Sequence, residues 1–378
     1  MVAPLVESVP PQLYGGTERF VAWLVNALVA MGHDVTLFAS GDSQTSARLH
    51  KCSPKNLRRM YEDLKEKPAD YIAWQKQATH AMLQEVFKHV MNGEFDIVHL
   101  NVDDPEAFRL FSSKELPCPV VMTMHGRLDL EGLRAAYQEH PLPLVSISND
   151  QRTHFKMSNA NWAGTVYHGL PEDLYQLENE TLGDYLLFIG RVSREKGLES
   201  AIRIAGEAHI PLKIIAKIDP TDREYYREKI HPLIFGNSNI EFVGEKNDQE
   251  KQKYLNRARA LIFPINWPEP FGLVMIEAMA TGRPVVAFGC GSVPEVLKHG
   301  ETGFVVEKEN YEDKIREAIH FVNACKNLSP QKIRKIFLRD FTAKKMAEGY
   351  VEIYQKLWQE RRAGQKTQNL WMKKGKIV

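Results

Sequence analysis

Short apolar runs rich in β-forming residues alternate with helix-type patterns along the whole chain, and this alternation limits the possible folds more than any other feature. In the first half the runs lie at residues 1–5, 35–38, 97–100, 120–124, 144–147 and 165–167. In the second half they lie at residues 185–189, 212–216, 240–243, 260–263, 285–288 and 304–306. Strands that alternate with helices are typical of parallel sheets with crossover helices. Because 378 residues exceed one ordinary core, the two sets predict two doubly wound α/β domains with a ligand site in the cleft between their strand ends.

The pattern is interrupted near residues 170–183, where Pro171, several carboxylates and Gly183 separate the two sets of runs. Residues 341–358 have the spacing of an amphipathic helix. One face of this helix is formed by Met346, Tyr350, Ile353, Tyr354 and Leu357. Residues 361–378 form a tail with six basic and no acidic residues. The sequence thus predicts two domains, a late helix and a basic tail.

Composition and charge narrow the class of protein. The net charge of +1 gives no overall attraction to nucleic acid, so we expect no nucleic-acid partner. The four cysteines are scattered without a CxxC pair, as in proteins of reducing compartments. The N-terminus lacks a basic start followed by an apolar stretch, and no apolar run reaches the roughly 20 residues that span a bilayer. We therefore expect a cytoplasmic protein that at most docks peripherally on the inner membrane face.

A turn between a strand and a helix carries two cations, Arg191 and Lys196. Ser193 between them is suited to cap the helix, whose N-terminus offers free N–H groups and partial positive charge. The two cations could therefore clamp a diphosphate, although taken alone they are more often solvated surface residues. The segment does not match the GxxxxGK[ST] pattern of a P-loop.

A second strand-to-helix segment carries two carboxylates, Glu269 and Glu277. Glu269 lies in the sequence Trp-Pro-Glu-Pro-Phe-Gly, which is an unusual way to build a solvated surface, and its carboxylate can accept hydrogen bonds from sugar hydroxyls. Backbone N–H groups at the helix start are offered by Phe271, Gly272 and Leu273. One carboxylate such as that of Glu277 can accept from both hydroxyls of a ribose diol. We therefore expect a functional role for both glutamates over two helix-surface positions.

Three elements occur here in one order and spacing: Arg191…Lys196, the E-x7-E pair Glu269 and Glu277, and the Gly-Ser-Val-Pro-Glu loop at 291–295. In this combination the chain resembles retaining glycosyltransferases of family 4, in the group that includes glycogen synthases and mannosyltransferases. The resemblance is strong from about residue 185 to 306 and weak elsewhere. It implies the GT-B architecture of two facing Rossmann-like domains, with a C-terminal helix that crosses back to the first domain.

The resemblance also assigns the parts of the chain. It implies an acceptor domain at 1–172, a donor domain at 173–342, a crossover helix at about 343–360 and the basic tail at 361–378. Family members usually have a few more residues before the first strand, which here starts at Met1, so we expect a short first strand or a start further upstream.

Within the first domain, the resemblance implies that Gly15 and Gly16 belong to a glycine loop close to the donor phosphates. It also implies that His125, at a strand end, lies near the donor sugar. Asp103 and Asp104 follow another strand, where they could meet the acceptor or cap the helix that starts at Pro105.

The resemblance implies transfer of a hexosyl unit, with retention, from a UDP- or GDP-sugar to a hydroxyl of an acceptor sugar, glycan or small molecule. It implies catalytic roles for His125, Glu269, Arg191 and Lys196, and donor binding by the glycines, the helix-start amides and Glu277. No D-x-D motif occurs, so we expect no metal and no cofactor. One alternative is a nucleotide-sugar epimerase on the same architecture. Another is a nucleotide-binding dehydrogenase, but its glycine fingerprint is broken here, because Pro294 stands where the third glycine belongs.

Overall fold

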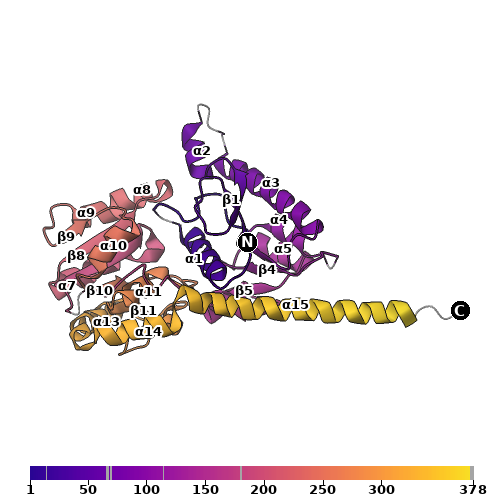
Figure 1. The fold of residues 1–378 in the computed structure, drawn as a ribbon. Coiled ribbons are helices and arrows are strands. Elements are labelled where there is room, and N and C mark those ends of the chain that lie inside the picture. Colours follow the sequence, from indigo (N-terminus) through magenta and orange to yellow (C-terminus); the bar gives the residue numbers. More distant parts are fainter. Residues whose placement is uncertain (14, 65–67, 69, 114, 179–180, 375–378) are drawn as a thin grey trace.

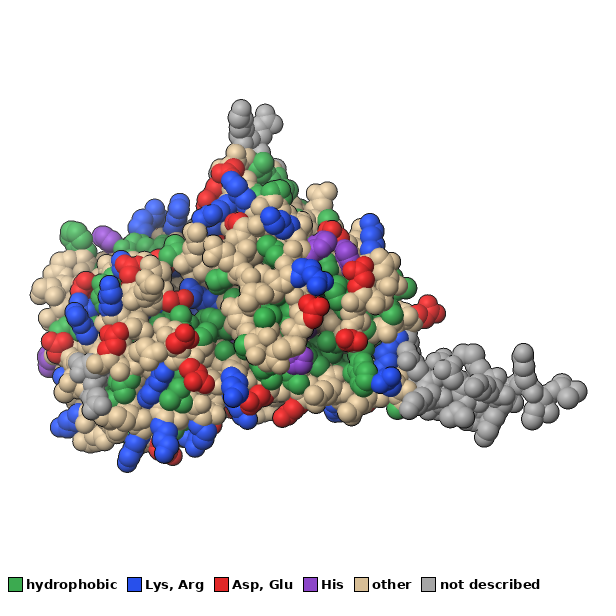
Figure 2. All heavy atoms as spheres, in the orientation of Figure 1, with side chains coloured by type: hydrophobic (Ala, Val, Ile, Leu, Met, Phe, Trp, Pro, Cys, Tyr) green, Lys and Arg blue, Asp and Glu red, His purple; other side chains and the backbone are tan. Residues whose placement is uncertain are grey.

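The computed structural model of the chain describes residues 1–378 apart from 14, 65–67, 69, 114, 179–180 and 375–378, and for 220 and 364–374 it describes the backbone alone. Two parallel sheets organise the molecule, each covered by helices, and they form two domains that lie side by side (Figure 1). Lysine, arginine, aspartate and glutamate side chains are intermingled over the visible face of both domains, in keeping with the small net charge (Figure 2).

The second half of the chain is built on a six-stranded sheet. Its strands are β7 (Tyr185–Arg191), β8 (Leu212–Lys217), β9 (Ile240–Phe242), β10 (Ala258–Phe263), β11 (Val285–Phe288) and β12 (Gly303–Val306). They lie in the order β12-β11-β10-β7-β8-β9, and all neighbours are parallel. The strand order therefore reverses between β7 and β10, which is where doubly wound sheets bind ligands at their carboxyl ends.

The first half contains β1 (Thr36–Ser40), β2 (Arg48–Ser53), β3 (Val98–Leu100), β4 (Val120–Thr123), β5 (Leu144–Ser146) and β6 (Trp162–Thr165). β1 pairs with β2, and β3 to β6 pair in sequence. Val2 joins these two blocks, because it forms parallel bridges to both Phe38 and Leu100. The reversal of strand order in this sheet therefore lies at Val2, between β1 and β3.

Two strand predictions need correction. The run at 1–5 forms only the single-residue bridges of Val2, and the strand predicted at 165–167 lies at Trp162–Thr165. The polar strand β2 was not predicted. It is an edge strand whose side chains are exposed or half-buried, so it lacks the apolar alternation by which buried strands are recognised.

Helices fill the connections between strands. In the first domain they are α1 (Gly16–Ala30), α2 (Leu57–Asp63), α3 (Tyr71–Met91), α4 (Pro105–Phe111), α5 (Glu131–Glu139) and α6 (Asn149–Phe155). In the second they are α7 (Leu198–Ala208), α8 (Arg223–Tyr225), α9 (His231–Ile234), α10 (Asp248–Leu255), α11 (Leu273–Ala280), α12 (Val293–Val296), α13 (Tyr311–Ala324) and α14 (Pro330–Asp340). Short turns occur at η1 (Arg194–Lys196), η2 (Pro220–Asp222), η3 (Tyr226–Ile230) and η4 (Cys325–Asn327). No helix in the described part of the chain is long and apolar enough to cross a membrane.

The last helix, α15 (Ala343–Lys374), leaves the second domain and packs on the first, which confirms the predicted crossing (Figure 1). Its buried face includes Met346, Tyr350 and Leu357. The Tyr350 hydroxyl lies 2.9 Å from the hydroxyl of Thr123 in the first domain. The helix extends beyond the predicted end near residue 360, and the side chains of the basic tail from 364 onward lie outside the described residues.

The backbone passes between the domains twice, and the two passages lie together. Leu170 forms a parallel bridge with Thr342, and its N–H donates to the carbonyl of Phe341 at 2.9 Å. The Ala343 N–H in turn donates to the Leu170 carbonyl at 2.7 Å. The two covalent connections between the domains therefore lie side by side.

Candidate active site

A cavity of about 390 Å³ lies between the two domains and is lined by residues of both. Its first-domain wall includes the start of α1, and its second-domain wall includes the segments that follow β7 and β10. The cavity is thus placed at the strand-order reversals of both sheets, and its volume is typical of a small-molecule site. Among the residues predicted for the site, it is lined by Gly15, Gly16, His125, Lys196, Glu269, Phe271, Gly272, Leu273 and Glu277.

Lys196 and Glu269 form an ion pair on the cavity wall. The Lys196 Nζ atom donates to Glu269 Oε2 at 2.6 Å, and the Trp267 indole N–H donates to the same oxygen at 2.8 Å. The two loops meet at Gly197, which has φ +72° and whose Cβ, if present, would lie 2.0 Å from the carbonyl oxygen of Pro264. Only glycine permits this contact, so Gly197 is what brings Lys196 beside Glu269.

The loop at 291–295 braces Glu269 from the other side. A Cβ on Gly291 would lie 2.3 Å from the Glu269 nitrogen, and the Ser292 N–H donates to the Glu269 carbonyl at 2.9 Å. Glu295 then reaches the first domain, where it accepts from the N–H groups of Asn149 at 2.8 Å and Asp150 at 2.7 Å. The loop therefore positions the carboxylate of Glu269 and links the two domains.

Arg191 does not lie where the sequence analysis placed it. Its Nη2 atom is 2.6 Å from Glu195 Oε1, its Nε atom is 3.3 Å from Asp222 Oδ2, and it does not line the cavity. Ser193 makes no capping hydrogen bond, because only the short turn η1 follows it and α7 begins at Leu198. Of the two cations predicted to clamp a diphosphate, Lys196 lines the cavity and Arg191 does not.

Four cations that the sequence analysis missed line the cavity: Arg19, Lys217, Lys246 and Lys251. They come from α1, the end of β8, the loop before α10, and α10. Of these, Lys217 carries a sequence signal, since it is the last residue of a buried strand. Together with Lys196 they face the carboxylates of Glu245, Glu269 and Glu277, so the cavity is suited to an anionic ligand.

Glu277 is buried within a network of charges. Both of its oxygens accept from Lys251 Nζ at 2.9 Å, and Lys251 Nζ is also 3.0 Å from Asp248 Oδ1. Arg19 of the first domain pairs with the other oxygen of Asp248. Burial alone would raise the pKa of Asp248, but the nearby charges of Lys251 and Arg19 hold it at about 2. The network connects the start of α1 with α10 and α11.

His125 follows β4 and is half-buried, and the desolvation of its ring lowers its pKa to about 3, so the ring is neutral at pH 7. Its Nε2 atom lies 3.0 Å from Asn101 Oδ1, which can only accept, so the proton is assigned to Nε2. Nδ1 is then an acceptor, and it has no hydrogen-bond partner among the described residues. His168, which the sequence analysis missed, stacks on His125 with ring centroids 5.7 Å apart and also lines the cavity. His125 therefore contributes a neutral ring to the cavity wall.

Asp103 and Asp104 do not line the cavity. Asp104 caps α4 by accepting from the Glu106 N–H at 2.8 Å. Asp103 Oδ2 accepts from the backbone N–H of Gly126 at 3.0 Å and of His125 at 3.3 Å, and burial raises its pKa to about 6. Asp103 thus fixes the backbone that carries His125, and its contact with an acceptor stays a prediction.

Two helices direct their N-termini into the cavity. Gly16 and Thr17 begin α1, and Gly272 and Leu273 begin α11; all four line the wall. Free N–H groups at a helix start, with the positive end of the helix dipole, bind phosphate oxygens well. The cavity therefore offers backbone donors from both domains in addition to its cations.

The sequence matches two family models and resembles known proteins. The family model "Glycosyltransferase Family 4" matches residues 14–161, and the model "Glycosyl transferases group 1" matches residues 175–335. An uncharacterised glycosyltransferase of Methanocaldococcus jannaschii is 25% identical over 288 residues, which cover 72% of this chain and 79% of that protein.

Solved structures show the same fold. Sucrose-phosphate synthase from Thermosynechococcus elongatus has a TM-score of 0.75 at 18% identity, over 95% of this chain and 98% of that one. HepE from Anabaena in complex with UDP-glucose has a TM-score of 0.66 at 18% identity, over 92% and 97%. The two family models together span both domains, and the fold has the two facing parallel-sheet domains of GT-B enzymes. The chain is therefore a glycosyltransferase that belongs to family 4 and has the GT-B architecture.

Proposed function

We propose that the protein transfers a hexosyl unit from a UDP- or GDP-sugar to an acceptor hydroxyl, with retention at the anomeric carbon and without a metal ion. The observation that carries this proposal is the Lys196–Glu269 pair on the cavity wall. In this proposal, Lys196 would meet the leaving diphosphate, and the carboxylate of Glu269 beside it would accept from the hydroxyls of the transferred sugar.

Such a reaction requires above all that the enzyme stabilise the charge that develops in the transition state. Departure of the nucleoside diphosphate leaves negative charge on phosphate and oxocarbenium character on the sugar, and donors fixed in place before the reaction stabilise that charge most. Lys196 and the N-termini of α1 and α11 would hold the phosphates. Glu277, which is held by Lys251, would accept from the ribose hydroxyls with its remaining lone pairs.

His125, as a neutral ring on the cavity wall, would contact the donor sugar. The acceptor would approach on the face from which the diphosphate departs, and the leaving phosphate would take its proton, which gives retention. The likeness to HepE in complex with UDP-glucose supports a UDP-hexose as the first donor to test.

Two measurements test the proposal. A thermal-shift screen of UDP, GDP and ADP should show stabilisation by one of the first two, about 2.7 kcal/mol at a hundredfold excess over its Kd. With the matching nucleotide sugar and an acceptor, NMR should show a product whose anomeric configuration equals that of the donor. An inverted product would refute retention, and conversion of the donor to its epimer without acceptor would show an isomerase instead. Loss of transfer in EDTA with recovery on adding Mg²⁺ or Mn²⁺ would refute the metal-free step.

A further inference from the structure

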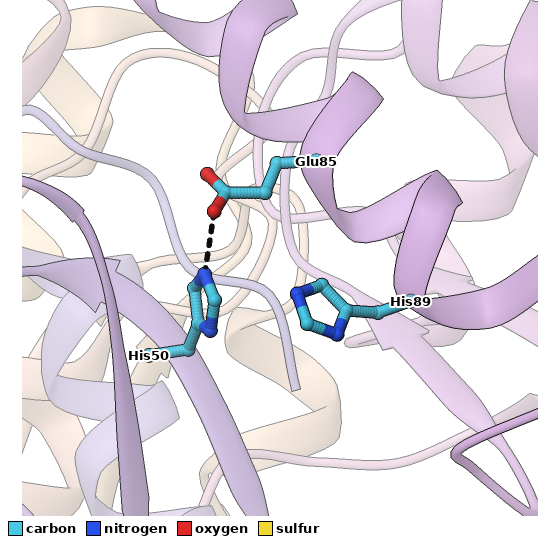
Figure 3. Close-up of side chains that lie close together, drawn as sticks. All are labelled: His50, Glu85 and His89. Carbon is cyan, nitrogen blue, oxygen red and sulfur yellow. Dashed lines mark hydrogen bonds and ion pairs between the residues drawn. The ribbon is translucent and has the colours of Figure 1, made fainter. Parts of the chain in front are cut away.

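A group of metal-ligating side chains lies in the first domain, on residues that do not line the active-site cavity. His50 comes from the edge strand β2, and Glu85 and His89 come from α3 (Figure 3). Glu85 and His89 are four residues apart and share one face of the helix, opposite His50. Two separate elements therefore converge on one point.

The ligand atoms are close enough for a single ion. One atom from each of the three side chains lies within 4.8 Å of the others, and His50 Nε2 is 2.7 Å from Glu85 Oε1. Around a tetrahedral zinc ion, whose ligand bonds measure about 2.0–2.1 Å, ligand atoms lie about 3.4 Å apart. Small side-chain rotations would give this spacing if they lengthen the distance between His50 Nε2 and Glu85 Oε1 and move the His89 ring toward both.

Glu94 orients the ring of His89 for metal binding. The His89 Nδ1 atom is 2.8 Å from Glu94 Oε2, and the Asn92 side-chain N–H donates to the other oxygen of Glu94 at 3.2 Å. A carboxylate on Nδ1 fixes that nitrogen as the protonated one and leaves Nε2 free to bind a metal, as in most histidine metal ligands. Figure 3 shows one nitrogen of His89 turned toward the gap between His50 and Glu85.

The surroundings are apolar on one side and open on the other. The buried ring of Phe38 lies under both histidines, at centroid distances of 4.5 Å from His50 and 5.5 Å from His89. The side chains of His50, Glu85 and His89 are 28%, 43% and 30% exposed. An ion can therefore enter from solvent and complete its coordination with water.

We propose that His50, Glu85 and His89 bind a divalent transition-metal ion of the zinc class, and that Glu94 is a positioning residue for His89. Imidazole and carboxylate ligands in this combination suit Zn²⁺, whereas Mg²⁺ and Ca²⁺ prefer oxygen ligands alone. The ion ties the edge strand β2 to α3. Its expected effect is stabilisation of the first domain, separate from the transfer reaction in the cavity.

The test uses the full chain after chelator treatment and removal of the chelator. Calorimetric titration with ZnCl₂ should give one ion bound per chain, and Co²⁺ should give the visible absorption bands of a low-symmetry nitrogen and oxygen site. His50→Gln and His89→Gln should each abolish both signals. Glu94→Gln should retain the one-ion stoichiometry with a Kd that is about ten to a hundred times weaker.

A matched control is offered by His154, which pairs with Asp150 at 3.1 Å on one helix and belongs to no such group. His154→Gln should bind Zn²⁺ as the wild type does. Circular dichroism checks that each variant folds, and hydrogen exchange at 48–53 should slow on adding Zn²⁺ only in the wild type and this control. Absence of binding to the wild type, or unchanged binding in folded His50→Gln and His89→Gln, would overturn the proposal.

Discussion

Lys251 places its Nζ atom 2.9 Å from both carboxylate oxygens of Glu277, and both side chains are buried at the cavity wall. The carboxylate that we assign to the ribose is thus already paired with a cation. A carboxylate has about four lone-pair positions, so a diol can add to this contact without displacing it. Lys251 then fixes the orientation in which Glu277 meets the nucleotide.

Glu277→Gln should therefore have two effects. It should weaken binding of the free nucleoside diphosphate and of the donor, and it should lower the free energy of unfolding by about 3 kcal/mol, since it removes one of the two carboxylate charges that pair with the buried Lys251. Calorimetry with UDP or GDP and thermal unfolding measure the two effects. Glu207→Gln, at an exposed carboxylate of α7 that does not line the cavity, is the control. Wild-type affinity in folded Glu277→Gln would remove Glu277 from the nucleotide site.

Glu269→Gln should separate catalysis from nucleotide binding. Contacts to the transferred sugar can strengthen as its bond breaks, whereas contacts to the nucleotide are present throughout. We expect kcat to fall about tenfold to a hundredfold, which corresponds to one charged hydrogen bond, while affinity for the bare diphosphate stays near wild type. Equal loss of diphosphate affinity in Glu269→Gln and Glu277→Gln, with kcat unchanged in the former, would refute the division of roles.

Lys196→Ala and Arg191→Ala should differ, because only Lys196 lines the cavity. Lys196→Ala should weaken diphosphate binding by about 1.5–3 kcal/mol, the value of a charge-assisted bond to phosphate. Arg191→Ala should change that affinity less than Lys196→Ala, since Arg191 pairs with Glu195 and Asp222 and does not line the cavity. Calorimetry on both variants decides this. An equal or larger loss in Arg191→Ala would restore the two-cation clamp.

Glu18 predicts a pH dependence of stability. Its burial in α1, followed by the nearby charge of Glu7, raises its pKa from 4.5 to about 7. The folded state thus holds a proton that the unfolded state releases at lower pH, so Glu18 favours folding below about pH 4.5 and loses this contribution as the pH rises through 7. Glu18→Gln, which cannot ionise, should lose about 3 kcal/mol less than wild type between pH 4.5 and 7.5. If the free energies of unfolding of the two proteins change with pH in the same way over this range, the raised pKa of Glu18 is contradicted.

Truncation should distinguish the two parts of α15. A chain that ends at Thr342 loses Met346, Tyr350 and Leu357, and each large buried side chain contributes roughly 1.5–3 kcal/mol. We expect a much lower melting temperature or aggregation. A chain that ends at Ala363 keeps this face and should melt near wild type. Equal melting temperatures of the shortest and the full chain would show that the packing of α15 contributes little.

Much of the fold could be predicted because buried parallel strands leave a strong signal. The run Tyr185–Ile189 and the observed β7 (Tyr185–Arg191) begin at the same residue, since both faces of that strand are covered. β2 could not be recognised in this way, because an edge strand that carries Arg48, His50 and Lys51 has no apolar alternation. Its place in the sheet depends on pairing with β1, which local sequence does not encode.

Cavity residues on strand-to-helix turns could be predicted from the sequence. Cavity residues that meet only through contacts between distant segments were missed. Lys196 and Glu269 lie on strand-to-helix turns, and such turns gather at one sheet edge. Arg19 and Lys251 reach the cavity only because a helix of the first domain meets one of the second. Arg191 was misplaced because the turn that follows it is too short to present both cations on one side.

The bonded passages at Leu170 and Thr342 have a consequence for motion. Two tethers at one place leave the domains little freedom except rotation about that place, and they keep the opposing walls at a high effective concentration. Contacts across the gap, such as the buried pair of Arg19 with Asp248, then hold the two walls together. Any opening of the cavity would therefore be a pivot at these passages that leaves both sheets intact.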